Sequence, residues 1–191
     1  MPNNMQKNRC GWCVGSDLYE KYHDEEWGVT THDDKVLFEF VVLESAQAGL
    51  SWITVLKKRE AYKKAFANFD VKKVAKFDDA KVEELMLNEG IIRNRLKIKA
   101  TITNAQIFIA IQKEYGSFND YLYSFMPDKK PIVNNFKSLS ELPARNDISD
   151  AISKDLKKRG FKFFGTTICY AHMQATGMVN DHLLTCFKRK K

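Results

Sequence analysis

Apolar residues recur along most of this chain at intervals of three and four positions, the spacing of one face of an α-helix. The clearest example starts at Thr31, a predicted N-cap, and stops near Gly49. Its apolar stripe consists of Leu37, Phe40, Val41 and Ala48. Alternation with a period of two, which marks a half-buried strand, is nowhere convincing, and Ile132–Val133 is too short to predict a strand.

The same pattern predicts roughly ten short helices and no sheet. The predicted helices span 17–27, 31–49, 51–66, 71–77, 79–88, 93–115, 118–126, 148–159 and 166–176. Segment 127–146 holds three of the four prolines, so we expect an irregular connection there, and 160–165 is predicted to be a hairpin. We therefore expect an all-α fold in which residues 1–191 form one unit, with two helical lobes sharing one cleft.

No apolar run approaches the ~20 residues needed to span a bilayer. The segment from Met1 to Cys10 is polar and lacks the apolar centre of a signal peptide. We therefore expect a cytoplasmic protein with no membrane partner, and a monomer.

Basic residues outnumber acidic residues, 31 to 24, which gives a net charge of +7 at pH 7. This balance favours an anionic partner, most commonly nucleic acid, although a solubilising lysine surface is the alternative. The basic residues cluster at 57–59, 157–159 and 188–191. Such clusters suit contact with phosphate groups.

Two pairs of cysteine and histidine residues could hold a metal ion. His182 and Cys186 are four positions apart, which on a helix would place both side chains on one face. Cys10 and His23 could supply the other half of a Cys2His2 set, which suits tetrahedral zinc. The alternative is that His182 and Cys186 are isolated residues near a frayed end of the chain.

The other two cysteines fit this interpretation less well. Cys13 forms a CxxC pair with Cys10, but no strand–helix context of the thioredoxin type surrounds it, so a metal explains the pair better than redox chemistry. Cys13 competes with Cys10 as a ligand, whereas Cys169 is predicted to pack in the core.

Glu44 falls inside the apolar stripe of its predicted helix. A buried carboxylate costs several kcal/mol unless it is paired. It therefore has either a structural partner, such as an arginine or a helix N-terminus, or a role in recognition or catalysis in a pocket.

Aromatic residues are concentrated near Glu44 in the sequence. Five tryptophans and tyrosines lie within the first 52 residues, namely Trp12, Tyr19, Tyr22, Trp27 and Trp52. A carboxylate surrounded by indoles and phenols suits a flat, cationic ligand, through stacking and cation–π contact. The alternative is that these rings only fill the core.

The predicted hairpin could bind phosphate. Glycines at both ends permit tight turns, and the helix that begins at Thr166 would point free N–H groups outward beside Lys162 and Gly165. Such a loop would grip a nucleic-acid backbone without reading its sequence. The alternative is an ordinary helical hairpin with a basic surface.

Six stretches together resemble the 3-methyladenine DNA glycosylase I family, a zinc-bearing branch of the helix-hairpin-helix glycosylases. They are residues 9–12, 22–28, 47–59, 90–93, 156–169 and 179–182, and they are spread over nearly the whole chain. The sequence departs from the family pattern at Cys13 and in the segment before Arg9.

The resemblance implies one structural zinc ion that joins the two ends of the chain, bound by Cys10, His23, His182 and Cys186. It implies that Glu44 recognises the base and that aromatic residues line the pocket. These residues are Trp12, Tyr19, Tyr22 and Trp52.

The implied reaction is base excision from double-stranded DNA that carries alkylated bases. The base is flipped out and 3-methyladenine is released by hydrolysis, with 3-methylguanine open as a second substrate. Gly49 and Leu50 lie between two helices, where Leu50 would wedge into the gap left by the flipped base. Lys162, Gly165 and Thr166 would contact DNA.

Relatives in the wider superfamily carry an aspartate two residues before a histidine, and Asn180 holds that place before His182. Asp181 is adjacent but off the pattern, so we expect a monofunctional hydrolase that depends on Glu44. Two alternatives stay open. One is a glycosylase with lyase activity, for which Lys162 is the candidate nucleophile; the other is a zinc-stabilised DNA-binding module without activity.

Overall fold

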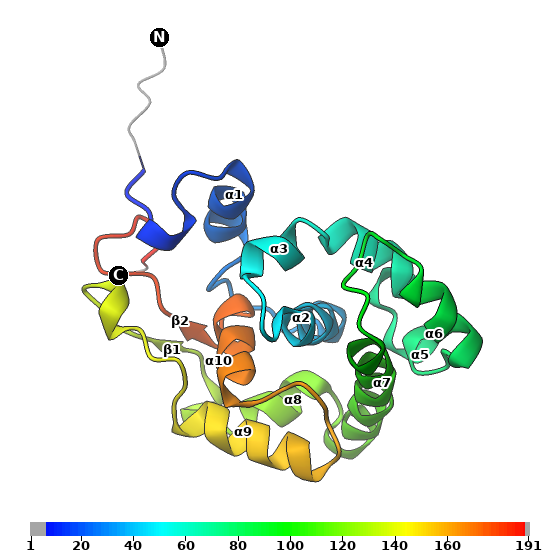
Figure 1. Cartoon of the computed structure of the whole chain (residues 1–191). Coiled ribbons are helices and arrows are strands. Elements are labelled where there is room, and N and C mark those ends of the chain that lie inside the picture. Colours follow the sequence, from blue (N-terminus) through cyan, green and yellow to red (C-terminus); the bar gives the residue numbers. More distant parts are fainter. Residues whose placement is uncertain (1–6, 190–191) are drawn as a thin grey trace.

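The computed structural model of the chain describes residues 7–189, and most of these are helical (Figure 1). The α-helices are α1 (Asp17–Glu25), α2 (Asp34–Gln47), α3 (Trp52–Leu56), α4 (Arg59–Ala65), α5 (Val71–Val74), α6 (Asp79–Met86), α7 (Arg95–Tyr115), α8 (Phe118–Tyr123), α9 (Asp147–Lys158) and α10 (Thr166–Ala175). The 3-10 helices are η1 (Gly11–Cys13), η2 (Ala67–Phe69), η3 (Pro127–Lys129) and η4 (Leu139–Glu141). The predicted helical class is therefore confirmed. Part of the polar N-terminal segment, residues 1–6, and part of the basic tail, residues 190–191, lie outside the described residues.

The prediction that the chain forms no strand is wrong at one place. β1 (Ile132–Val133) pairs in parallel with β2 (Val179–Asn180), with Ile132 opposite Val179. Each strand is only two residues long, so neither shows an alternating pattern. The pairing joins the irregular segment before α9 to the segment after α10.

Two predicted helix boundaries are also wrong. Thr31 is not the N-cap of α2, because Asp33 accepts the hydrogen bond from the backbone N–H of Lys35 at 2.9 Å, and Thr31 Oγ1 instead accepts one from the Asp33 N–H. The predicted helix 51–66 divides into α3 and α4 because the backbone at Lys58 leaves the helical region, with φ −97° and ψ 0°.

Helix α2 lies at the centre of the molecule, where α3, α7, α8 and α10 surround it (Figure 1). Nine of the ten α2 residues from Leu37 to Ala46 are buried, the exception being Glu39, which explains why this helix is apolar on nearly all sides. Cys169 is buried in the same core, as predicted. A second, smaller apolar cluster forms between α1 and the segment after β2, and includes Tyr22, Trp27 and Leu183.

The two ends of the described chain meet beside α1. The backbone N–H of Phe187 donates to the carbonyl of Asn8 at 2.9 Å, and the Asn8 side chain donates to the carbonyl of Thr185 at 2.7 Å. In Figure 1, the first blue segment and the last red segment accordingly lie side by side. The division into two lobes stays a prediction.

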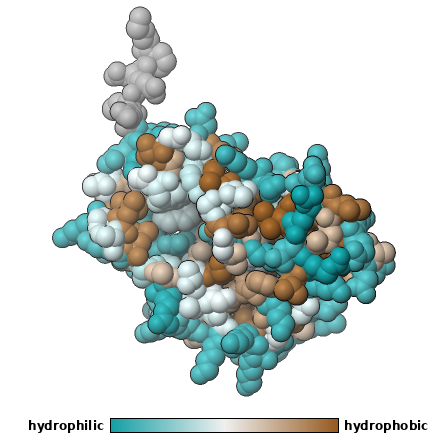
Figure 2. Space-filling model, viewed as in Figure 1, coloured by the Kyte–Doolittle hydropathy of each residue, from teal (hydrophilic) through white to brown (hydrophobic). Residues whose placement is uncertain are grey.

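Within residues 7–189 no helix combines the length and the apolarity required to cross a bilayer. Hydrophilic side chains cover much of the face seen in Figure 2, with smaller apolar areas between them. Exposed apolar residues include Leu50, Leu87 and Leu96, which are 41%, 81% and 70% exposed.

Candidate functional site

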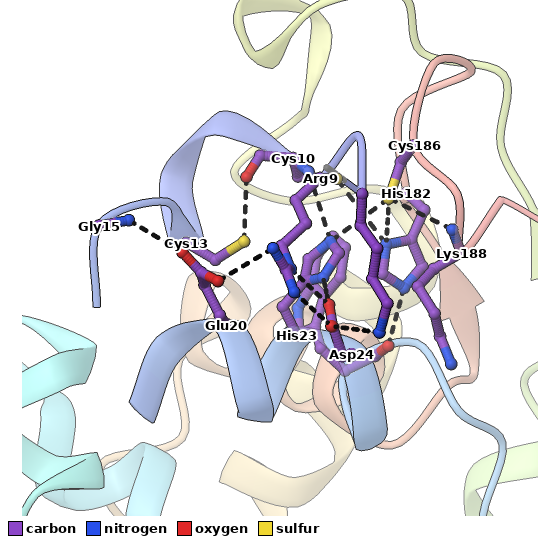
Figure 3. Close-up of polar contacts among 12 residues, drawn as sticks. Arg9, Cys10, Cys13, Gly15, Glu20, His23, Asp24, His182, Cys186 and Lys188 are labelled. Atoms are coloured by element: carbon purple, nitrogen blue, oxygen red, sulfur yellow. Dashed lines mark hydrogen bonds and ion pairs between the residues drawn. The ribbon is translucent and has the colours of Figure 1, made fainter. Parts of the chain in front are cut away.

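Four buried side chains from opposite ends of the chain converge on one point beside α1 (Figure 3). They are Cys10, His23, His182 and Cys186, and their nearest side-chain donor atoms all lie within 4.8 Å of one another. The Cys186 sulfur lies 3.4 Å from Nε2 of His23 and 3.5 Å from Nδ1 of His182. The Cys10 sulfur lies 3.7 Å from Nδ1 of His182.

These distances fit a tetrahedral zinc site. With Zn–S bonds of about 2.3 Å and Zn–N bonds of about 2.0–2.1 Å, the ligand atoms of a tetrahedron are separated by roughly 3.4–3.8 Å. One thiol is suited to bind a metal as a thiolate, because the hydrogen bond from Cys10 lowers the pKa of the Cys186 thiol, whereas the same bond raises the pKa of the Cys10 thiol. Two thiols and two imidazoles are a donor set that favours zinc over calcium or magnesium.

The outer nitrogen of each imidazole is held in place. Nδ1 of His23 lies 2.9 Å from Oδ1 of Asp24, and Nε2 of His182 lies 2.9 Å from the carbonyl oxygen of Trp27. This leaves Nε2 of His23 and Nδ1 of His182 to face the centre. Hydrogen bonding of the outer nitrogen to a carboxylate or carbonyl is typical of histidines that bind zinc.

Asp24 is in turn fixed by basic side chains. Arg9 binds it through two hydrogen bonds of 3.0 Å and 2.9 Å (Figure 3). Lys7 lies 3.4 Å from the same carboxylate. Burial alone would raise the pKa of Asp24, but the hydrogen bonds from Arg9 and His23 outweigh it and lower the pKa. The group beside His23 is therefore a carboxylate at neutral pH.

The structure separates Cys13 from this cluster. Its thiol points to the carbonyl oxygen of Cys10, at 3.1 Å, so Cys10 alone contributes a sulfur from this end of the chain. The expectation that His182 and Cys186 share a helix is wrong, since the segment after β2 is formed of turns. One such turn, in which the Cys186 N–H donates to the Leu183 carbonyl at 2.8 Å, brings the two side chains together instead.

A cavity of about 220 Å³ lies next to the metal cluster. Residues from η1, α1, α2, α3 and α10 line it, together with residues of two connections. They are Trp12, Tyr19, Tyr22, Trp27, Glu44, Gln47, Trp52, Leu142, Ala171 and Gln174. The predicted carboxylate and all four predicted base-binding aromatic residues therefore share one cavity.

Glu44 is 3% exposed, and its Oε2 atom has no hydrogen-bond partner among residues 7–189. No arginine or helix N-terminus in this part of the chain pairs with it, so the structural alternative has no support there; Arg59 binds Glu26 and Glu39 instead. Burial raises the pKa of Glu44 to about 8. An unpaired acceptor inside a cavity is a group available to a ligand.

The aromatic walls of the cavity are fixed by contacts with each other. Trp12 packs edge-on against Tyr19 and Trp27, with ring centroids 5.4 Å and 5.1 Å apart, and Tyr22 lies 5.5 Å from Trp52. The Nε1 atom of Trp52 is buried without a hydrogen-bond partner among the described residues. Trp52 and Glu44 thus offer the cavity a free donor and a free acceptor between flat apolar walls.

The metal cluster and the cavity are formed by residues that neighbour or contact each other. Tyr22 precedes His23 on α1, and Trp27 lines the cavity while its carbonyl oxygen accepts from His182. His23 also packs against Trp12, with ring centroids 5.5 Å apart. The position of the aromatic wall therefore depends on the position of the metal ligands.

Hydrogen bonds from Lys97 hold the turn that carries Leu50. Gly49 has φ +80°, a conformation that glycine adopts without strain, and Leu50 is 41% exposed. Nζ of Lys97 donates to the carbonyl oxygens of Ala46 and Ala48 at 2.8 Å and 2.6 Å. These bonds satisfy carbonyls at the end of α2, which a helix leaves without partners.

The hairpin between α9 and α10 is anchored by a buried asparagine. Asn104 donates to the carbonyl of Lys162 at 2.9 Å and accepts from its N–H at 2.8 Å, while the Lys162 side chain is exposed. Gly165 is the N-cap of α10, and the hydroxyl of Thr166 is bonded to Asp150. Thr166 thus has an internal partner that the sequence did not indicate.

Arginines in two of the predicted basic clusters are committed to ion pairs. Arg59 binds Glu26 and Glu39, and Arg159 binds Glu114 and Asp155. In these two clusters the lysines are thus better placed than the arginines to meet a phosphate backbone.

The cavity also contains residues that the sequence did not single out. Leu142 comes from the irregular connection before α9, while Ala171 and Gln174 lie three positions apart on α10. They reach the cavity through long-range packing, which has no local pattern in the sequence. Asn180 and Asp181, by contrast, are buried and do not line the cavity.

Comparisons with known proteins agree on one family. A sequence model described as methyladenine glycosylase matches residues 12–189. The chain is 52% identical over 178 residues to DNA-3-methyladenine glycosylase 1 of Escherichia coli, which covers 93% of this chain and 95% of that protein. It is 48% identical to a DNA-3-methyladenine glycosylase of Haemophilus influenzae, over 93% of this chain and 96% of that protein.

Solved structures give the same result. A crystal structure of 3-methyladenine DNA glycosylase I superposes with a TM-score of 0.92 at 50% identity, covering 96% of this chain and 100% of that one. A second, from Staphylococcus aureus and solved to explain recognition of 3-methyladenine, has a TM-score of 0.92 at 37% identity, covering 97% and 98%.

Proposed function

The chain belongs to the methyladenine glycosylase family, and on that premise we propose that its cavity receives 3-methyladenine from alkylated DNA. The protein is a DNA glycosylase of base-excision repair, which hydrolyses the N-glycosidic bond of the damaged base. The unpaired, buried Oε2 atom of Glu44 among aromatic rings is the observation that carries the assignment of the cavity.

Methylation at N3 makes the adenine cationic and weakens its glycosidic bond. A base held between Trp12, Tyr22 and Trp52 would be recognised by stacking, which every base permits, and by its charge, which normal adenine lacks. Glu44 would accept hydrogen bonds from the amino edge of the base, and its ionised form would stabilise the cation. The free N–H of Trp52 would donate to a ring nitrogen.

Water supplies the nucleophile in this proposal. Asn180 replaces the aspartate of the wider superfamily, and Asp181 is buried beneath three hydrogen-bond donors. Neither residue lines the cavity, so Glu44 and the positive charge of the substrate would provide most of the rate enhancement.

Zinc is the metal that the four-residue cluster fits, and Cys10, His23, His182 and Cys186 would hold it. All four donors come from the protein and leave no open position for water, so its role would be structural. It would keep α1, with Tyr19 and Tyr22, against the segment after β2.

The DNA backbone would bind to the loop between α9 and α10, used as a helix-hairpin-helix motif. Lys162, Gly165 and the start of α10 at Thr166 would contact phosphates, while Gly49 and Leu50 would enter the duplex behind the flipped base. Double-stranded DNA as the bound form, a monomeric state and a cytoplasmic location stay predictions.

The lyase alternative is less well supported. Lys162, its only candidate nucleophile, has an exposed side chain on the hairpin and does not line the cavity. Borohydride trapping on DNA with abasic sites separates the two, because a Schiff base forms only with a lyase. We expect no trapped complex.

The decisive experiment incubates the protein with methylated DNA and identifies the released bases by chromatography. We expect release of 3-methyladenine by the wild type and a sharp loss with Glu44→Ala, whose circular dichroism should stay that of the wild type. Near-normal release by the folded variant would overturn the role of Glu44. Absence of any released base would leave only a zinc-stabilised DNA-binding module.

A further inference from the structure

Asp181 is a fully buried carboxyl group that the proposed reaction does not use. Three side chains donate hydrogen bonds to it: Asn134 at 2.7 Å, Tyr170 at 2.8 Å and Gln174 at 2.8 Å. Tyr170 and Gln174 lie one turn apart on α10, and Asn134 follows β1. Of these groups, only Gln174 also lines the cavity that contains Glu44.

The carboxylate fixes the orientation of the Gln174 amide. Both carboxyl oxygens of Asp181 accept hydrogen bonds, and the Gln174 amide accordingly turns its NH₂ group toward Oδ2 of Asp181. The amide oxygen is then directed away from Asp181. No hydrogen bond to Oε1 of Gln174 is found among residues 7–189, so this oxygen is free to accept one.

We propose that Gln174 is a specificity-determining residue, which presents its amide oxygen to the bound base as a second acceptor opposite Glu44, and that Asp181 is its positioning residue. Gln174 reaches the cavity from α10 and Glu44 from α2, two helices that pack against each other. The proposal rests on the proposed function, since it assigns a contact to the base in that same cavity.

Two acceptors select the group at position 6 of the purine. The amino group of an adenine offers two N–H donors, one for each acceptor, whereas a guanine carries a keto oxygen there, which only accepts. The keto oxygen would leave both acceptors unpaired and face their lone pairs. The pocket should therefore prefer 3-methyladenine over any 3-methylated purine with a 6-keto group, including the 3-methylguanine that the family resemblance left open.

The test measures binding of two free bases by the fluorescence of the cavity tryptophans. The bases are 3-methyladenine and 3-methylhypoxanthine, which has a keto oxygen in place of the amino group. The readout is the ratio of the two Kd values. A variant that weakens binding of both bases by the same factor leaves this ratio unchanged. Gln174→Met keeps the shape of the side chain and removes the acceptor, and Gln106→Met is the matched control, because Gln106 binds the Ala75 carbonyl and does not line the cavity.

We expect the wild type and Gln106→Met to prefer 3-methyladenine to the same extent, and the preference to fall about tenfold in Gln174→Met. Asp181→Asn should lower it in part, because an amide can donate as well as accept and no longer fixes the glutamine. Tyr170→Phe removes a different donor from Asp181 and should preserve the preference.

An unchanged preference in Gln174→Met overturns the proposal, even when the wild type releases 3-methyladenine from DNA. Failure of that release instead overturns the proposed function. If Asp181→Asn does not fold, the side-chain NH₂ resonance of Gln174 in the wild type, identified by its loss in Gln174→Met, tests the positioning. Slow hydrogen exchange supports the bond to Asp181, and fast exchange overturns it.

Discussion

The phenolic oxygen of Tyr19 accepts a hydrogen bond from the backbone N–H of Ile53 at 2.9 Å. This bond ties α1 to the first turn of α3, where the N–H groups of a helix lack partners within the helix. Tyr19 therefore serves the cavity twice: its ring forms part of the wall, and its oxygen fixes the helix that carries Trp52.

The first prediction concerns this bond. Tyr19→Phe keeps the ring but leaves the Ile53 N–H without its acceptor. We expect a loss of about 1 kcal/mol in the free energy of unfolding. We also expect weaker binding of 3-methyladenine, measured by tryptophan fluorescence, because Trp52 is held less firmly. Wild-type affinity in the folded variant would show that α3 keeps its position without Tyr19.

The second prediction follows from the raised pKa of Glu44. Its ordinary pKa of 4.5 holds in the unfolded chain, whereas burial raises the pKa to about 8 in the folded protein. Between these values the folded state keeps a proton that the unfolded state has lost, so Glu44 lowers stability as pH rises, by at most about 1.4 kcal/mol per pH unit. Urea denaturation from pH 5 to 8 should show that the free energy of unfolding falls more steeply with pH in the wild type than in Glu44→Gln. Equal slopes of the two proteins would contradict the prediction.

The same group predicts a pH dependence of activity. If the carboxylate is the form that stabilises the cationic base, kcat/KM should rise with pH and level off above about 8, because this constant reports the free enzyme. The rise in kcat should occur at lower pH than the rise in kcat/KM, because the bound cationic base stabilises the carboxylate form of Glu44. Single-turnover rates on methylated DNA measure both, and a kcat/KM that falls toward pH 8 would exclude this role for the carboxylate.

The fourth prediction concerns the residue behind His23. Asp24→Asn removes the charge that orients the His23 ring while leaving all four metal ligands in place. We expect zinc affinity to fall about 10–100-fold, as is usual when such a partner is lost. Competition with a chromophoric chelator measures the affinity. The variant should regain wild-type base release when zinc is in excess; a defect that zinc does not restore would assign Asp24 a different role.

The fifth prediction separates DNA binding from base recognition. Asn104→Ala leaves the N–H and carbonyl of Lys162 without their partners and should loosen the hairpin. We expect weaker binding to a duplex oligonucleotide by fluorescence anisotropy, with unchanged affinity for free 3-methyladenine. Equal weakening of both would show that Asn104 supports the whole fold rather than the hairpin.

The sequence predicted well those features that depend on local periodicity. The helix around Glu44 and the burial of this carboxyl group follow from a spacing of three and four residues, and both are present in the structure, although α2 is buried on nearly all sides rather than along one stripe. The N-cap at Thr31 was wrong because several residues near a helix end can serve as caps, and a side-chain contact of Asp33 decides between them. The break at Lys58 was missed because it is a change in backbone conformation without a side-chain cap.

The features that the sequence did not predict depend on contacts between distant segments. The pairing of β1 with β2 joins two residues of each strand, which are too few to show an alternating pattern of apolar and polar residues. Gln174 and Leu142 are unremarkable in their own segments and enter the cavity only through packing. His182 and Cys186 were identified as a pair, but a turn rather than a helix brings them together.

The metal cluster also has a consequence for the order in which the protein is made. Cys10 and His23 leave the ribosome well before His182, which is synthesised 172 residues after Cys10. Until then α1 has no complete set of ligands to hold it against the segment after β2. A nascent chain can bury its core around α2 before His182 and Cys186 are made, but its aromatic pocket is closed only after both have been added. A truncated chain that lacks His182 and Cys186 would therefore lack a finished pocket, even if its helices form.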